Sequence, residues 1–160
     1  MKYNQAVNFL KSGKLDKAKV LCLEILEEQP DDFDTLRLFA LISFQDKNYH
    51  QSVDLISRAI KIKPNFAEIY NFYSIVLIHL KKIDEAIKSW NDAIKIKPDY
   101  AEAYYNRANA LLELGRLDEA IESYDKAIQI KPDYAEVHNN RGNALLKLGR
   151  LDEAIESYDK

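Results

Sequence analysis

Four prolines recur at one fixed interval along this chain, and their spacing constrains the fold more than any other feature. Pro30, Pro64, Pro98 and Pro132 are each separated from the next by 34 residues. Self-similarity at a fixed period indicates that each period is one small unit of secondary structure, which cannot bury its apolar face alone. Neighbouring units must therefore stack on one another, and the chain is expected to form an elongated array.

Alignment on these prolines divides the chain into four full repeats and one incomplete repeat. The repeats cover 1–32, 33–66, 67–100, 101–134 and 135–160, which we expect to form a single domain over 1–160. In the fourth repeat, residues from Tyr104 to Leu111 and from Ala120 to Ala127 show helical spacing on either side of Gly115. Each repeat is therefore predicted to be a helix, a short turn and a second helix, so the fold class is all-α.

Local signals predict where these helices begin and end. Gly13, Gly115 and Gly149 occupy the turn within a repeat, where a left-handed backbone closes the first helix. Lys47 and Lys81 occupy the same place in the second and third repeats, and we expect a strain cost there. Three pairs spaced by three residues predict side-chain caps on the first helices: Asn65 and Glu68, Asp99 and Glu102, Asp133 and Glu136.

Two repeat positions hold a small residue in every repeat, and we expect the helices to approach each other there. The position in the first helix is occupied by Ala6, Ala40, Ser74, Ala108 and Gly142. The position in the second helix is occupied by Ala18, Ser52, Ala86, Ala120 and Ala154. Enlarging any of these residues should overpack the hairpin.

Composition disfavours several classes of function. The 160 residues carry a net charge of −3 with interspersed signs, so the chain lacks the basic surface typical of nucleic-acid binding. No segment resembles a signal peptide or an uninterrupted apolar membrane span. Cys22 is a single cysteine and cannot form an intrachain disulfide. We therefore expect a cytoplasmic protein with neither nucleic acid nor membrane as a partner.

Residue patterns that carry catalysis are absent from the sequence. It contains no phosphate-binding glycine loop, no nucleophile elbow and no cysteine or histidine spacing suited to zinc. His50, His79 and His138 lie in different repeats at different repeat positions. We therefore predict no catalytic residue, no metal site and no cofactor, and we expect that the protein is not an enzyme.

The repeat resembles the tetratricopeptide repeat family. That family combines an aromatic residue, a small residue, an apolar residue, alanine, a second aromatic and proline over 34 residues, and the fourth and fifth repeats follow this pattern most completely. The resemblance covers the whole chain. It implies a right-handed superhelical α-solenoid whose first helices line a concave groove that holds peptides or protein segments.

The resemblance also implies which side chains face that groove, because family members use five recurring positions of the first helix. The predicted peptide-binding residues are Arg37, Leu41, Asn71, Phe72, Ile75, Tyr105, Asn106, Asn109, Asn139, Asn140 and Asn143. Amides carry both donors and an acceptor, so a row of asparagines is suited to the backbone of an extended peptide. The alternative is that these asparagines are exposed to solvent and contribute nothing to ligand binding.

The inward positions of the second and third repeats are apolar and admit two interpretations. Leu38, Leu41, Phe72 and Ile75 either pack against neighbouring repeats or form a hydrophobic docking floor. Arginine replaces the usual apolar residue in the next two repeats, and Asp appears at a second-helix position of the same two repeats. We predict that Arg107 pairs with Asp125 and Arg141 with Asp159, each within one hairpin.

These features favour a noncatalytic protein-interaction scaffold that binds a peptide or a partner protein in the groove. An alternative is a substrate-recruiting module of a larger enzyme, because the segments NRANAL and NRGNAL resemble repeats in bacterial relatives of O-linked N-acetylglucosamine transferases. A second alternative is a self-assembling scaffold. The last repeat stops within its second helix, so Ala154, Ile155 and Tyr158 are expected to expose apolar surface and promote homo-oligomerisation through repeat ends.

Overall fold

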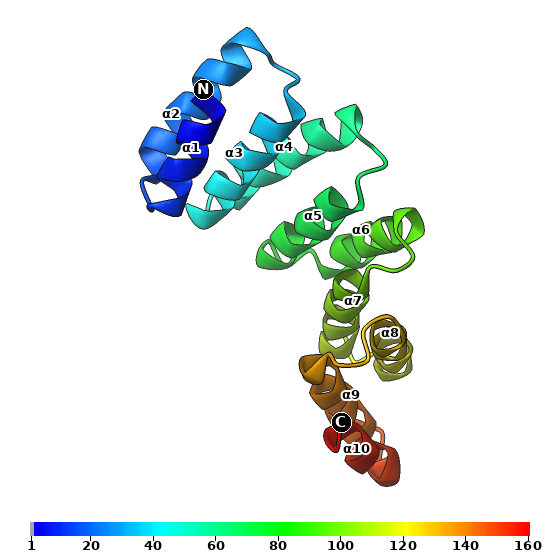
Figure 1. Ribbon diagram of the computed structural model, residues 1–160. Coiled ribbons are helices and arrows are strands. Elements are labelled where there is room, and N and C mark those ends of the chain that lie inside the picture. Colours follow the sequence, from blue (N-terminus) through cyan, green and yellow to red (C-terminus); the bar gives the residue numbers. More distant parts are fainter. Residues whose placement is uncertain (1) are drawn as a thin grey trace. The chain divides into compact units, whose positions relative to one another are not determined.

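The computed structural model describes residues 2–160, and within that range the secondary structure consists of ten α-helices and no strand (Figure 1). The helices are α1 (Lys2–Lys11), α2 (Leu15–Glu28), α3 (Phe33–Gln45), α4 (Tyr49–Ile62), α5 (Ala67–His79), α6 (Ile83–Ile96), α7 (Ala101–Glu113), α8 (Leu117–Ile130), α9 (Ala135–Lys147) and α10 (Leu151–Tyr158). The predicted all-α fold of helix–turn–helix repeats is therefore confirmed.

The chain forms two compact units. Unit 1 is Met1–Lys82 and contains α1 to α5, and unit 2 is Ile83–Lys160 and contains α6 to α10. Helices α3, α5, α7 and α9 begin where the proline alignment starts each repeat. A single domain over 1–160 remains a prediction, and each unit is described by itself below.

The turns inside the repeats adopt the left-handed backbone that their sequence predicts. Gly13, Gly115 and Gly149 have φ values of 71°, 73° and 76°, and the lysines at the same repeat position, Lys47 and Lys81, have φ values of 58° and 60°. A residue with a Cβ atom costs roughly 1–2 kcal/mol in this conformation, whereas glycine adopts it freely. The strain predicted for the two lysine turns is therefore present in the backbone.

The predicted side-chain caps are wrong at three helix starts. Helices α5, α7 and α9 follow the aromatic residues Phe66, Tyr100 and Tyr134, and none of these N-caps has a side-chain hydrogen bond. The helices begin one residue after the aromatic, so the acid or amide before it lies outside the cap position. Asp32 does cap α3, where its carboxylate accepts a hydrogen bond from the backbone amide of Thr35 at 2.9 Å.

Unit 1 is held together by large apolar side chains. Leu36, Ile42 and Ile56 are fully buried, and α3 packs against α2 on one side and α4 on the other. The buried residues of α3 lie on most of its circumference: Phe33, Thr35, Leu36, Leu38, Phe39, Ala40, Ile42 and Ser43. A helix that is apolar nearly all round is expected in the middle of a stack, and α3 occupies such a place.

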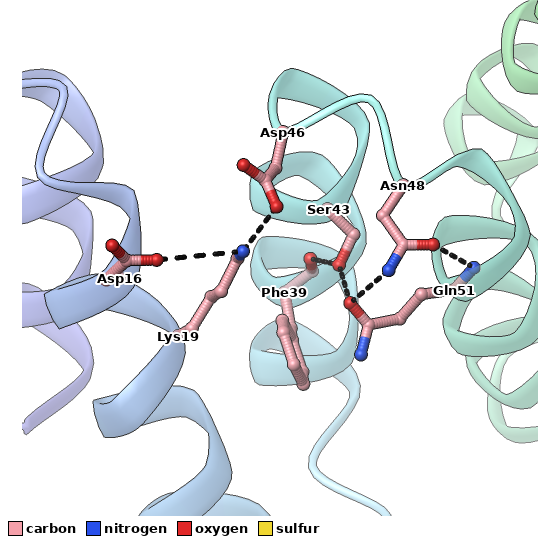
Figure 2. Close-up of polar contacts among 7 residues, drawn as sticks. All are labelled: Asp16, Lys19, Phe39, Ser43, Asp46, Asn48 and Gln51. Atoms are coloured by element: carbon pink, nitrogen blue, oxygen red, sulfur yellow. Dashed lines mark hydrogen bonds and ion pairs between the residues drawn. The ribbon is translucent and has the colours of Figure 1, made fainter.

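Polar contacts stabilise the turn between α3 and α4 and connect it to α2 (Figure 2). Lys19 of α2 forms an ion pair with Asp46, the C-cap residue of α3, at 2.5 Å. Asn48 caps α4, where its side-chain oxygen accepts from the backbone amide of Gln51 at 3.2 Å. The Gln51 side chain in turn accepts from the Ser43 hydroxyl at 2.9 Å. These contacts fix the turn and link two consecutive repeats.

Unit 2, like unit 1, has small residues that let the helices come close. Helix α7 packs against α6 and α8, and α9 packs against α8 and α10. Both small-residue positions predicted from the sequence are buried in every repeat. At Gly142 the approach leaves no room for a side chain, because a Cβ atom there would lie 2.6 Å from the ring of Tyr158. Glycine is therefore required at this position unless the tyrosine moves.

Candidate peptide-binding surface

The first helices of unit 1 form a pocket of about 230 Å³. Its lining comes from α1, α3 and α5 and consists of Tyr3, Arg37, Leu38, Leu41, Glu68, Ile69 and Phe72. Leu41 is 38% exposed, whereas Leu38 is 7% and Ile69 1% exposed. The apolar residues at the inward positions therefore have different roles. Leu38 packs into the core, and Leu41 remains accessible in the pocket.

Arg37 supplies positive charge at this pocket, and its position is fixed by aromatic rings. The guanidinium carbon lies 4.7 Å from the ring centre of Phe66 and 5.4 Å from that of Phe33. One guanidinium nitrogen also lies 3.5 Å from a carboxylate oxygen of Asp34. Stacking on aromatic faces leaves the edge of a guanidinium free to donate hydrogen bonds. Arg37 is thus held in place beside an apolar floor.

Three of the five residues predicted for the groove in unit 1 come together at this pocket, namely Arg37, Leu41 and Phe72. Ile75 is partly buried and lies outside the pocket lining. Asn71 is only 5% exposed and has interactions of its own, so it offers little surface to a ligand. The burial of Asn71 therefore does not support its predicted role in binding a ligand in the groove.

In unit 2 the predicted asparagines hydrogen-bond to one another and to tyrosines. The side-chain amide of Asn140 donates to the Asn109 side-chain oxygen at 3.1 Å and to the Tyr105 hydroxyl at 3.2 Å. The same Asn109 oxygen accepts from the hydroxyl of the fully buried Tyr124 at 2.6 Å. These bonds join α7 to both α9 and α8, so the asparagines have a structural role that the sequence interpretation missed.

This network determines which atoms remain for a ligand. Both Asn140 amide protons are used, so its side-chain oxygen is the group left over. Asn109 and Asn143 use their oxygens, the latter accepting from the Tyr158 hydroxyl at 2.8 Å, so each retains its amide donors. The row therefore alternates between donors and an acceptor. Asn139 is exposed, while Asn106 is partly buried and not free.

The arginines of unit 2 connect consecutive repeats, which corrects the predicted pairing. Arg141 donates from Nε to the Asp125 carboxylate of the preceding repeat at 2.6 Å, not to Asp159. Arg107 donates to the Asn91 side-chain oxygen at 2.6 Å, not to Asp125. For Arg141 the sequence could not reveal this, because aspartate stands at the same position in both repeats, and only packing decides which repeat is nearer.

Within their own hairpins these arginines contact serines. Arg107 donates to the hydroxyl of Ser123 from Nε and from a terminal nitrogen, at 3.3 and 3.0 Å. Arg141 donates to Ser157 at 2.5 Å. Each guanidinium thus bridges the second helix of its own repeat and that of the repeat before it, and the fixed fork of donors suits such two-sided contact.

Burial shifts the pKa of two groups in this network. Burial lowers the pKa of the Arg107 guanidinium, while Tyr104 and two nearby glutamates act in the opposite direction. Burial also raises the pKa of the Tyr124 hydroxyl. Both shifts leave the hydrogen-bond donors in place near neutral pH, since arginine loses its proton only far above that range and tyrosine remains protonated.

Sequence reasoning left Tyr3, Glu68 and Ile69 out of the pocket of unit 1, and it named Leu38 only as a residue that either packs against neighbouring repeats or forms a docking floor. Tyr3 and Glu68 occupy the same inward repeat positions that were used for the later repeats, so applying the rule to every repeat would have found them. Leu38 also holds an inward position, whereas Ile69 does not. No signal in the sequence separates Ile69 from an ordinary core residue, and only packing places it at the pocket floor.

Two features of residues 2–160 bear on metal binding and membrane insertion. No group of three or more histidine, cysteine, aspartate or glutamate side chains is placed to hold a metal ion in this part of the chain. None of the helices formed by these residues has the length and apolar character needed to span a bilayer.

A family model described as TPR repeat matches residues 76–115 and 108–149. Among solved structures, that of MamA is 23% identical, with a TM-score of 0.90, and the match covers 96% of this chain and 90% of that one. PilF of Pseudomonas aeruginosa is 19% identical, with a TM-score of 0.87, over 99% of this chain and 72% of that one.

A third similar structure is YrrB, described as a TPR protein with an unusual peptide-binding site. It is 18% identical, with a TM-score of 0.81, and the match covers 99% of this chain and 81% of that one. At these identities the likeness to all three structures concerns the fold alone.

Proposed function

We propose that this chain, in which residues 76–149 match a model of the TPR repeat, is a noncatalytic protein-interaction scaffold that binds an extended peptide or a segment of a partner protein along its first helices. Function in such a fold resides in a surface rather than in the repeat architecture itself. The peptide-binding site described for YrrB is consistent with this proposal.

The observation that carries the proposal is the pocket of unit 1. It combines an accessible apolar residue, Leu41, with an apolar floor that includes Ile69 and a fixed cation, Arg37. Pockets that bind a ligand are mostly apolar with a few oriented polar groups, and this pocket has that composition. We infer that it takes one large apolar side chain of the ligand, with Arg37 placed to bind a neighbouring carboxylate or carbonyl oxygen.

The asparagines of unit 2 support a second mode of contact, directed at the ligand backbone. The amide donors of Asn109 and Asn143 and the acceptor of Asn140 match the alternating carbonyl and amide groups of an extended chain. Because their internal hydrogen bonds fix their orientation, little side-chain entropy is lost on binding. Contacts of this kind grip a peptide without reading its sequence, whereas the pocket of unit 1 supplies selectivity.

A displayed random-peptide library tests the proposal, because it requires no assumption about the sequence of the ligand. Peptides selected on the whole chain are measured by calorimetry against Leu41→Gln and against a matched control, Leu23→Gln. Leu41 and Leu23 are both exposed leucines of unit 1, at 38% and 50%, but Leu23 lies outside the pocket. We expect Leu41→Gln to weaken binding about tenfold, near 1.4 kcal/mol, and Leu23→Gln to leave it unchanged.

The two binding modes are separated by modifying the peptide. Methylation of its backbone nitrogens removes donors to Asn140 while keeping the side chains, so the affinity of a peptide bound to unit 2 should fall. Enrichment of no peptide, or equal losses for both leucine variants, would contradict the pocket as the ligand site.

A further inference from the structure

Two arginines occupy the same repeat position in unit 2, but only one of them has a counter-ion. Arg141 donates to the Asp125 carboxylate at 2.6 Å. Arg107 donates instead to the side-chain oxygen of Asn91, which stands at the position of Asp125 one repeat earlier. Its other partner, the Ser123 hydroxyl, is neutral as well. Within residues 2–160 Arg107 forms no ion pair, so neither of its contacts balances its charge.

The missing counter-ion matters because the Arg107 side chain is partly buried. Burial lowers the pKa of its guanidinium, while Tyr104, Glu119 and Glu122 act in the opposite direction. Neither glutamate lies within ion-pair distance of it, and Glu119 is held by Arg116, which donates to both carboxylate oxygens at 2.7 and 2.6 Å. Charges that are taken out of water are usually paired. The surroundings of Arg107 therefore favour the binding of an anion.

Arg107 has donors to offer such an anion, and a hollow lies beside it. A guanidinium carries five N–H donors, and the contacts with Asn91 and Ser123 use three of them, which leaves one on each terminal nitrogen. Arg107 lines two hollows, of about 200 and about 480 Å³. Asn91 and Ser123 line the smaller hollow but not the larger one. The larger hollow is therefore the side of Arg107 that none of its partners occupies.

The larger hollow combines apolar walls with an excess of positive charge. Its lining comes from α6, α7 and α8 and consists of Ile94, Tyr104, Arg107, Glu122, Asp125 and Lys126. Arg141 neutralises Asp125, whereas Arg107 and Lys126 have no carboxylate partner in the part of the chain that the structure describes. Glu122 is the remaining acid of the lining, so the unpaired side chains carry a net positive charge. The volume falls in the range of pockets that bind small ligands, roughly 300–1,000 Å³.

We propose that this hollow is a second binding site, which takes a carboxylate attached to an aromatic or apolar body. The carboxylate accepts hydrogen bonds from the two free N–H groups of Arg107 and supplies the counter-ion that Asp125 supplies to Arg141. The body of the ligand packs on Tyr104 and Ile94. A free organic acid and an acidic residue beside an aromatic one on a partner protein share this chemistry. The hollow contains no residue of the proposed peptide-binding site, so either proposal can fail alone.

Phenylacetate is the probe for this site, and phenylacetamide is a matched ligand without the charge. Each is titrated into the whole chain, and NMR follows the side-chain N–H signals of Arg107 and the ring signals of Tyr104. We expect saturable shifts with phenylacetate and binding about tenfold weaker, or less, with phenylacetamide, because hydrogen bonds to a charged acceptor are the stronger kind. Arg107→Leu, which restores the apolar residue usual at this position, should abolish the preference for the charged probe. Equal affinity of the two probes for the wild-type chain overturns the proposal.

The variant Asn91→Asp separates a ligand site from a purely structural role of Arg107. The new carboxylate should pair with Arg107 as Asp125 pairs with Arg141, so we expect a higher melting temperature and about tenfold weaker binding of phenylacetate. The matched control Asn91→Ala removes the same amide without adding a charge and should keep the binding. Wild-type affinity for phenylacetate in Asn91→Asp contradicts the assigned role of the free donors.

A blocked dipeptide amide of glutamate and phenylalanine distinguishes the two sources of the carboxylate. Tighter binding of this dipeptide than of phenylacetate assigns the site to a partner protein, and the reverse order assigns it to a free organic acid. The same dipeptide with glutamine in place of glutamate is the control and should bind more weakly. If neither charged probe binds, the hollow is not a carboxylate site.

Discussion

The two units build the same helical hairpin from different side chains. At one position of the first helix, unit 1 has Ile42 and unit 2 has Ala110, and both are almost completely buried. At another, unit 1 has Phe39, buried in the core, where unit 2 has Arg107, bonded to Asn91 and Ser123. At these two positions unit 1 is thus stabilised by large apolar contacts, and unit 2 by a small residue and by oriented hydrogen bonds.

This difference teaches that one backbone arrangement tolerates two kinds of interface. Dispersion and hydrophobic burial are nondirectional, so the apolar unit also tolerates a pocket with an accessible leucine. Hydrogen bonds are directional and costly to leave unmade, so the polar unit fixes the orientation of its asparagines. The surface that each unit offers to a partner follows from the way in which its own helices are joined.

The largest expected effect is at the apolar interface of unit 1. Ile42→Ala removes a fully buried side chain and leaves a cavity, so we expect it to lower the free energy of unfolding by about 2–5 kcal/mol. Urea denaturation followed by circular dichroism measures the change. The converse substitution at the same position, Ala110→Ile, should overpack unit 2 by roughly 1–3 kcal/mol. Small losses for both would show that the two interfaces do not differ as described.

The second effect is a dependence of stability on alkaline pH that originates in unit 1. Burial raises the pKa of the fully buried Cys22 thiol to about 11. The unfolded thiol loses its proton near pH 9 while the folded thiol keeps it, so stability attributable to this group falls as pH rises from about 9 to 11. At the upper end of that range the free energy of unfolding should be lower by roughly 2–3 kcal/mol.

Comparison with Cys22→Ala isolates this contribution. The stability difference between the wild-type chain and the variant should be constant below pH 8 and change steadily above pH 9. Thiol labelling at pH 8 should also be slow until the chain unfolds, since the thiolate is the reactive form. Rapid labelling of the folded chain would contradict the buried placement of this residue.

The third effect concerns the turns, where unit 2 has glycine and two of the turns of unit 1 have lysine. Gly115→Ala places a Cβ atom in a left-handed conformation, so we expect a cost of about 1 kcal/mol with no steric contribution, because nothing lies within 4 Å of that atom. Lys47→Gly in unit 1 relieves the same strain and should stabilise the chain by about 0.5–1 kcal/mol. Thermal melts measure the change in stability of each variant. Changes of the same sign in both variants would contradict the strain argument.

The smallest effect comes from the ion pair between repeats in unit 2. A double-mutant cycle on Arg141 and Asp125 should give a coupling of about 0.2–1 kcal/mol, since half of the aspartate side chain is exposed. A parallel cycle on Arg141 and Asp159 should give no coupling. Reversal of the two results would restore the pairing within one hairpin that the sequence had suggested.

Much of the fold follows from local sequence signals, and less of the candidate site does. The proline period, the small residues such as Ala108 and the turn glycines predict helices and turns because these features act within one repeat. The pocket around Leu41 was reached in part through the family resemblance. The buried state of Asn71 and the bonds of Asn140 were not, because each depends on side chains from another repeat.

The sequence alone determined that this chain forms helical hairpins, where they turn, and which small residues lie between helices. Tertiary structure decided which partner each polar group takes and which apolar faces remain exposed. Residues 117–126 and 151–160 have the same sequence and give the reason, because Ile121 is buried in α8 while its counterpart Ile155 is exposed in α10. Burial and pairing are properties of the surroundings that neighbouring helices create, and no residue carries them by itself.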